Sequence, residues 1–160
     1  MELQIVNPDP RYSTVKLMEP TALGYLHVAA QVRPRSLPFL PNGREKSELL
    51  SRLKESVQHL AEEEGATRVT LFDAIAFAPP SAYVKEQAGR VHLAHFDIVV
   101  LIETTSPEVA HIVQTTPAYE ALVQTLRSQA TDMHILAARN AKRVGDVDKT
   151  REGVFLFNYF

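Results

Sequence analysis

The stretch VHLAHFDIVVLIETTSP, residues 91–107, decides the fold of this chain. Apolar residues alternate from residue 91 to residue 104, which predicts a strand. One face of that strand carries Phe96, Ile98, Val100 and Ile102, and the other carries His95, Asp97, Val99, Leu101 and Glu103. Ser106 and Pro107 then provide a helix cap and a first-turn proline. The stretch therefore predicts a strand that leads directly into a helix.

Six further segments on either side of this stretch have clear periodicity. They are strands at 23–33, 68–77, 133–140 and 154–160, a helix at 44–64, and a helix that starts at Ser106 and is broken at Thr116–Pro117. The order β-α-β followed by β-α-β is that of the ferredoxin-like split βαβ arrangement, in which four antiparallel strands carry both helices on one face. We therefore predict an α+β fold, βαββαβ, with an extra C-terminal strand.

Length and composition predict a single domain. The chain has 160 residues, of which 45% are apolar, enough for one hydrophobic core and too few for two. We expect residues 1–22 to form an extended N-terminal arm, residues 23–141 the βαββαβ body, and residues 142–160 a loop followed by the last strand.

Charge and cysteine content exclude several classes of protein. The net charge is -2 with both signs interspersed, so no basic field exists to bind nucleic acid. The chain has no cysteine, which excludes disulfides, thiolate catalysis and cysteine-ligated metals. No apolar run approaches the ~20 residues that span a membrane, and the N-terminus lacks a basic region followed by an apolar one. We expect a cytoplasmic protein without a membrane or nucleic-acid partner.

One acidic residue interrupts an otherwise apolar strand face. Asp73 falls on the apolar side of the predicted strand 68–77. A bulge at this position would shift the register and turn the side chain outward. The alternative is a buried carboxylate that needs partners. We favour the bulge.

The second face of two predicted strands, 23–33 and 91–104, mixes apolar and ionisable side chains. It carries Tyr25, His27, Gln31, His95, Asp97, Val99 and Leu101. A face that is half apolar and half ionisable suits the wall of a cavity better than it suits bulk water or a dry core. Two such faces packed together would form a barrel.

This pattern resembles the dimeric α/β-barrel superfamily over residues 23–141. The resemblance rests on the element order, the acidic helix that ends at Gly65, the strand around Phe96–Val100, and Ser106–Pro107 opening a broken helix. It implies a homodimer whose sheets pack face to face. Members include cofactor-independent monooxygenases, small-ring isomerases and cyclases, haem-binding enzymes and ligand-binding proteins. The resemblance therefore implies a dimer and leaves the reaction open.

Three residues are candidates for acid–base chemistry in the predicted cavity. His27 has the residue type of a general base or a haem ligand, although a half-buried histidine bonded to a neighbouring strand fits the same pattern. His95 and Asp97 share a strand face, where a carboxylate can orient an imidazole for proton transfer. A surface or interface ion pair is the alternative for these two.

The predicted cavity wall would consist of Tyr25, Gln31, Val99, Leu101 and Arg139. Arg139 has the geometry to donate two hydrogen bonds to a carboxylate or enolate, or it reaches solvent from a strand end. His92 and His95 are three apart, on opposite faces of a strand, which gives no metal pair.

Three functions remain open on the sequence. The leading one is a homodimer that binds a small, largely apolar organic molecule, with no cofactor, and that transfers protons or uses oxygen if it is an enzyme. In that scheme His27, His95 and Asp97 form the acid–base set. The second is haem binding through one histidine. The third is a non-catalytic module for self-association.

Overall fold

The protein is described from a computed structural model, in which residues 17–34, 37, 39–79, 82–87, 89–90, 95–145 and 153–157 are placed. The strands are β1 (Gly24–Gln31), β2 (Ala66–Asp73), β3 (Ile98–Thr104) and β4 (Asp132–Arg139). The helices are α1 (Arg44–Ala61), α2 (Ala82–Glu86), α3 (Pro107–Val113) and α4 (Pro117–Arg127). The strands form one antiparallel sheet in the order β2-β3-β1-β4. This is the predicted α+β, ferredoxin-like βαββαβ fold.

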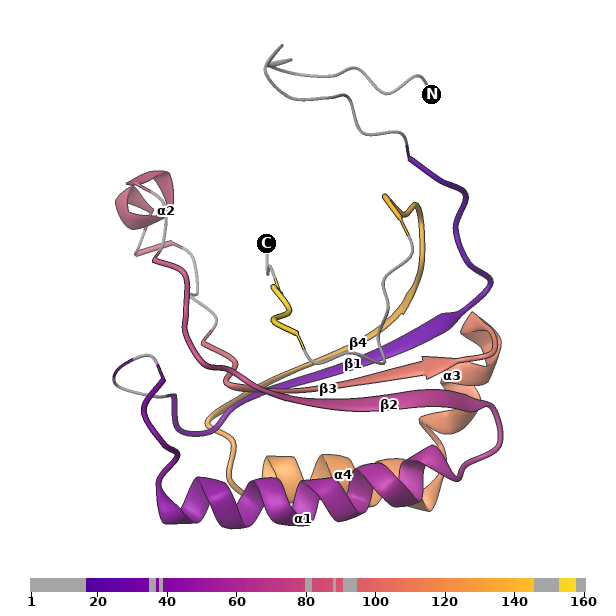
Figure 1. Cartoon of the computed structure of the whole chain (residues 1–160), viewed down its shortest axis with the longest axis horizontal. Helices are drawn as coiled ribbons and strands as arrows, with labels where there is room; N and C mark the ends of the chain where they lie inside the picture. The colour runs from indigo at the N-terminus through magenta and orange to yellow at the C-terminus, as the bar shows by residue number, and fades with distance from the viewer. Residues whose placement is uncertain are drawn as a thin grey trace.

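Helices α1 and α4 cover one face of the sheet, whereas α2 lies beyond the strand ends on the other side and does not cover that face (Figure 1). The core lies between the sheet and these two helices. It contains Leu26, Val28 and Ala30 from β1, Ile98, Val100 and Ile102 from β3, Leu49, Leu53 and Leu60 from α1, and Leu122, Val123 and Leu126 from α4. These are the strand faces and helix stripes that the periodicity predicts, except that Phe96, which precedes β3, packs with Ala29 and Val99 instead. The face without helices is called the open face below.

The predicted break between two helices is confirmed. The side chain of Ser106 accepts a hydrogen bond from the backbone N–H of Val109, and that of Thr116 accepts one from Tyr119. A proline follows each cap, at the position where its missing N–H leaves no hydrogen bond unmade. Two separate capped helices therefore replace one continuous helix.

Some predicted boundaries differ from the structure. Strand β3 starts at Ile98 rather than at residue 91, residues 95–97 form no strand, and residues 91–94 lie outside the described part. Helix α2 was not predicted. Residues 153–157 form no strand, and the rest of the predicted strand 154–160 lies outside the described residues. So does most of the predicted arm, of which Met18 pairs with Arg143.

In the residues that the structure describes, no helix is long and apolar enough to cross a membrane.

Candidate functional site

The open face is built from alternate residues of all four strands. The core side of each strand is settled by its contacts with the helices, so the ladder registers place the remaining residues opposite. The open face thus carries Tyr25, His27 and Ala29 on β1, Arg68, Thr70 and Phe72 on β2, Val99, Leu101 and Glu103 on β3, and His134, Leu136 and Ala138 on β4. Four of these, Tyr25, His27, Val99 and Leu101, are predicted cavity residues.

An aromatic and histidine cluster lies on this face. The rings of His27 and His134, from neighbouring strands, have centroids 6.3 Å apart in an edge-on arrangement. Phe157 lies 5.6 Å from His27 and 5.1 Å from Phe72. Phe96 stacks on His134 at 6.1 Å. These five residues, called the aromatic–histidine cluster, bring together segments that span most of the chain.

Burial changes the acid–base behaviour of His27. Loss of water around the half-buried imidazole lowers its pKa below the usual 6.5, and the nearby charge of His134 lowers it further. The ring is therefore mostly neutral at pH 7. A neutral imidazole on an apolar surface can accept a proton from a bound molecule.

A polar row borders the apolar part of the open face. In the strand register, Glu103 of β3 lies opposite Tyr25 of β1 and opposite Arg68 of β2. Glu103 is only 5% exposed, and the Tyr25 hydroxyl lies 3.5 Å from Oγ1 of Thr21. Along β1, the face therefore changes from polar at Tyr25 to apolar at Ala29.

The predicted pair of His95 and Asp97 does not form. Asp97 is fully buried, and its carboxylate accepts hydrogen bonds from Nζ of Lys46 at 2.6 Å and from the backbone N–H of Val32 at 2.7 Å. His95 is exposed and packs edge-on against Phe77. The alternation fails because Asp97 precedes the regular ladder, whose first β1–β3 pair is Ala30 with Ile98. His95 and Asp97 therefore do not form the predicted acid–base pair, and the role of His27 stays a prediction.

Two predicted cavity residues lie at the ends of strands. Arg139 ends β4 and is exposed. Ala137 packs against the core, so alternation places Arg139 on the helix side and away from His134. Gln31 ends β1, where its backbone oxygen accepts hydrogen bonds from Thr131. Neither residue belongs to the aromatic–histidine cluster.

A buried ionic cluster at the start of α1 was missed by the sequence analysis. Lys46 is 2% exposed and contacts Asp97 at 2.6 Å and Asp73 at 2.8 Å. Nδ2 of Asn42 donates to Asp73 at 2.6 Å. Lys46 precedes Leu49 by three residues and Leu53 by seven, so helical spacing places it on the buried stripe of α1. That spacing is the signal that would have identified it.

The same contacts answer the question of Asp73. This residue pairs with Ile98 in regular register, and the β2 irregularity lies between Ala66 and Arg68. The predicted bulge at Asp73 is therefore wrong. The carboxylate instead has the partners that its position requires, Lys46 and Asn42.

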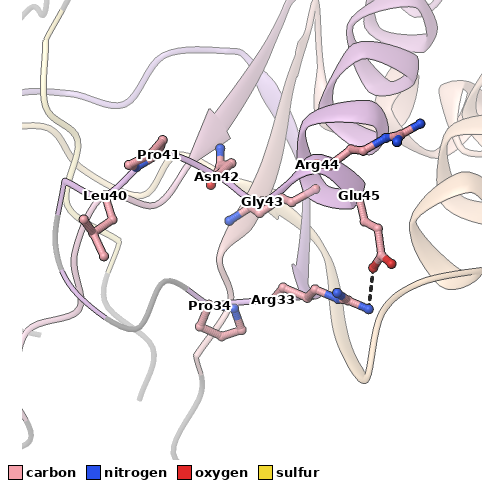
Figure 2. Close-up of a pocket in the computed structure, with 9 residues that line it drawn as sticks. Arg33, Pro34, Leu40, Pro41, Asn42, Gly43, Arg44 and Glu45 are labelled. Carbon is pink, nitrogen blue, oxygen red and sulfur yellow. Dashed lines mark ion pairs between the residues drawn. The ribbon is translucent and has the colours of Figure 1, made fainter.

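Two clefts lie beside this cluster rather than on the open face. The larger, about 410 Å³, is shown in Figure 2, with the ion pair of Arg33 and Glu45 among the residues that line it. The smaller is about 320 Å³ and shares Arg33 and Glu45. Both side chains are more than 60% exposed, so water screens their charges. The open face is the better candidate site because His27 is half-buried and Glu103 is buried there.

No group of three or more potential metal ligands of the histidine, aspartate or glutamate type occurs among the described residues.

Comparisons with known proteins give structural similarity alone. No family model matches the chain, and no curated protein matches it. A dimeric protein of unknown function with a ferredoxin-like fold from Bacteroides fragilis is 12% identical, with a TM-score of 0.49, over 75% of this chain and 98% of that one. A dimeric ferredoxin-like protein from Thermobifida fusca is 10% identical, with a TM-score of 0.45, over 79% and 99%.

A variant of SnoaB, a cofactor-independent oxygenase from Streptomyces nogalater, is 15% identical, with a TM-score of 0.41, over 73% of this chain and 92% of that one. Dimerisation and oxygenase activity are properties of those proteins. The fold of this chain rests on its own strand order and register.

Proposed function

We propose that the chain forms a homodimer through its open face and there binds a small, largely apolar organic molecule, from which His27 accepts a proton. The observation that carries this proposal is the half-buried His27, whose pKa is lowered by burial, on a sheet face that no helix covers. A general base that works near neutral pH needs to be unprotonated and within reach of its substrate.

The homodimer is supported by the apolar character of the open face. Leu136 on the edge strand β4 is 48% exposed, and Phe155 above the sheet is 43% exposed. An antiparallel sheet can leave one face in water, but that face is then mostly polar. A second copy would remove this apolar surface from water and would enclose the aromatic–histidine cluster.

The chemistry that fits this surface is proton abstraction next to a carbonyl group. His27 would take the proton, and the electron pair left on carbon would delocalise onto the carbonyl oxygen as an enolate. His134 lies close enough to His27 for both rings to contact one small molecule. When protonated, it would donate a hydrogen bond to the enolate oxygen. Return of the proton to another carbon completes an isomerisation.

The test is a ligand screen by NMR on the full-length protein, read from the side-chain resonances of its histidines. We expect ligands of this class to shift the His27 resonances and to bind at least about tenfold more weakly to His27→Ala. His59→Ala, on the exposed surface of α1, is the matched control and should bind like the wild type. Ligands that bind both variants and the wild type equally would exclude His27 from the site.

Haem binding is the second candidate, because both histidines of the cluster stand among aromatic rings. A titration with haemin distinguishes it. A saturable Soret shift at one haem per subunit that is lost in His27→Ala or His134→Ala would favour haem. A non-saturating titration, together with a positive ligand screen, would favour the first proposal. A homodimer that binds neither would be a module for self-association.

A further inference from the structure

The C-terminal segment, residues 153–157, lies on the open face, on the side of the sheet opposite α1 and α4 (Figure 1). Its side chains alternate. Val154 and Leu156 are 83% and 76% exposed, whereas the rings of Phe155 and Phe157 contact Phe72 of β2. An extended segment with this pattern presents one apolar side to the sheet and the other to its surroundings.

Phe157 packs against two rings of the open face. Its ring meets Phe72 edge-on at 5.1 Å and His27 at a tilt of 53° and 5.6 Å. It also packs against the buried cluster of Ala29, Phe96 and Val99. Centroid distances of 4.5–7 Å with inclined planes are those that aromatic pairs prefer.

The segment is attached to the sheet by these rings rather than by its backbone. Residues 153–157 belong to no strand, and no backbone hydrogen bond joins them to the other residues that the structure describes. Its departure from the sheet would therefore break no ladder hydrogen bond. The free energy that holds it is mainly the burial of two phenylalanine side chains, of which Phe155 remains 43% exposed.

We propose that Phe157 occupies the place of the ligand's own ring, so that the site takes a planar aromatic molecule and the C-terminal segment leaves when that molecule binds. This inference rests on the proposed function and names its ligand class. A flat ring in place of the Phe157 ring would keep both contacts that Phe157 makes, edge-on to Phe72 and beside the imidazole of His27. A substituent on that ring would then lie within reach of the base.

Phenol and cyclohexanol are the probes that test this inference, because they share size and a hydroxyl group and differ in planarity. Each is titrated into full-length wild type, Phe157→Ala and the control Ile112→Ala, whose side chain is exposed on α3 and away from the open face. Binding is followed by the His27 side-chain resonances. We expect phenol to bind Phe157→Ala at least about tenfold more tightly than wild type, and Ile112→Ala to behave as wild type. We expect cyclohexanol to bind every chain more weakly than phenol.

Phe157→Ala without ligand provides a readout that needs no probe. Removal of the ring exposes His27 to water, so its pKa should rise towards the usual value. An unchanged pKa would overturn the assigned position of Phe157. Phenol affinities that differ by less than about threefold between wild type and Phe157→Ala would overturn the displacement.

The remaining outcomes separate this inference from the function on which it rests. Cyclohexanol binding at His27 as tight as that of phenol would overturn the aromatic class and keep the apolar ligand. If neither probe nor any molecule of the NMR screen reached His27 in Phe157→Ala, both the inference and the proposed function would fall.

Discussion

His27 is half-buried on the open face, so its imidazole is more easily kept neutral than one in water. The unfolded chain has the ordinary pKa near 6.5 and binds a proton more readily than the folded chain does. Above about pH 6.5 the ring is neutral in both states, and the folded state has its full stability. This part of the stability is lost as the pH falls through the lower pKa that His27 has in the folded state.

We therefore expect the free energy of unfolding of the wild type to decrease as the pH falls below about 6.5, and that of His27→Gln to decrease less. Urea denaturation at a series of pH values measures both. His59→Gln, which replaces an exposed histidine of α1, should retain the pH dependence of the wild type. Parallel curves for wild type and His27→Gln would contradict the burial of this ring.

Lys46 is the buried cation that holds two carboxylates together. Its replacement in Lys46→Met leaves Asp97 buried and Asp73 beside it without the charge that compensates them. Removal of one partner of a buried ion pair costs about 3–5 kcal/mol. We expect a loss of this size in the free energy of unfolding measured with urea.

The control is the exposed ion pair of Arg44 and Glu48 on the same helix. Arg44→Met should cost less than about 1 kcal/mol, because exposed pairs contribute little. Similar losses for Lys46→Met and Arg44→Met would mean that Lys46 is solvated rather than buried.

The packing of α3 against the start of β1 depends on a glycine. A Cβ atom at Gly24 would overlap the backbone oxygen of Ser106 and Cα of Pro107, and neither backbone atom can move without shifting the helix start. Gly24→Ala should therefore lower the free energy of unfolding by about 1–3 kcal/mol. Gly145, whose Cβ would meet open space, is the control, and Gly145→Ala should change stability by less than about 0.5 kcal/mol. Thermal or urea unfolding compares the two.

The proposed dimerisation through the open face is tested on the whole molecule. Leu136→Glu places a carboxylate on that face, where an interface would bury it without a partner. Since burial of an unpaired charge costs several kcal/mol, we expect the dissociation constant of the dimer to rise by a factor of about 10² or more. Sedimentation equilibrium measures it.

Ile112→Glu is the matched control, because Ile112 is also exposed, at 61%, but belongs to α3. It should sediment with the wild type at twice the mass of the chain. A wild type that stays monomeric would overturn the proposed dimer. A dimer that Ile112→Glu dissociates and Leu136→Glu does not would place the contact elsewhere.

Local patterns predicted the elements because each depends on neighbours a few residues away. The alternation of β1 and the caps at Ser106 and Thr116 follow from steric and hydrogen-bonding rules that act within one turn or one strand. The strand order follows from chain connectivity. The same alternation failed at Asp97, where the chain has left the ladder and periodicity no longer determines the side-chain direction.

The sequence by itself determined the α+β class, the split of the second helix and the open-face position of His27. Only the tertiary structure decided that Asp97 meets Lys46, that His134 lies beside His27 and that Phe157 packs on both His27 and Phe72. These contacts join residues 51 to 130 positions apart in the chain. Periodicity specifies which face of an element a residue occupies, whereas contacts between distant segments depend on register and packing, which the folded chain sets as a whole.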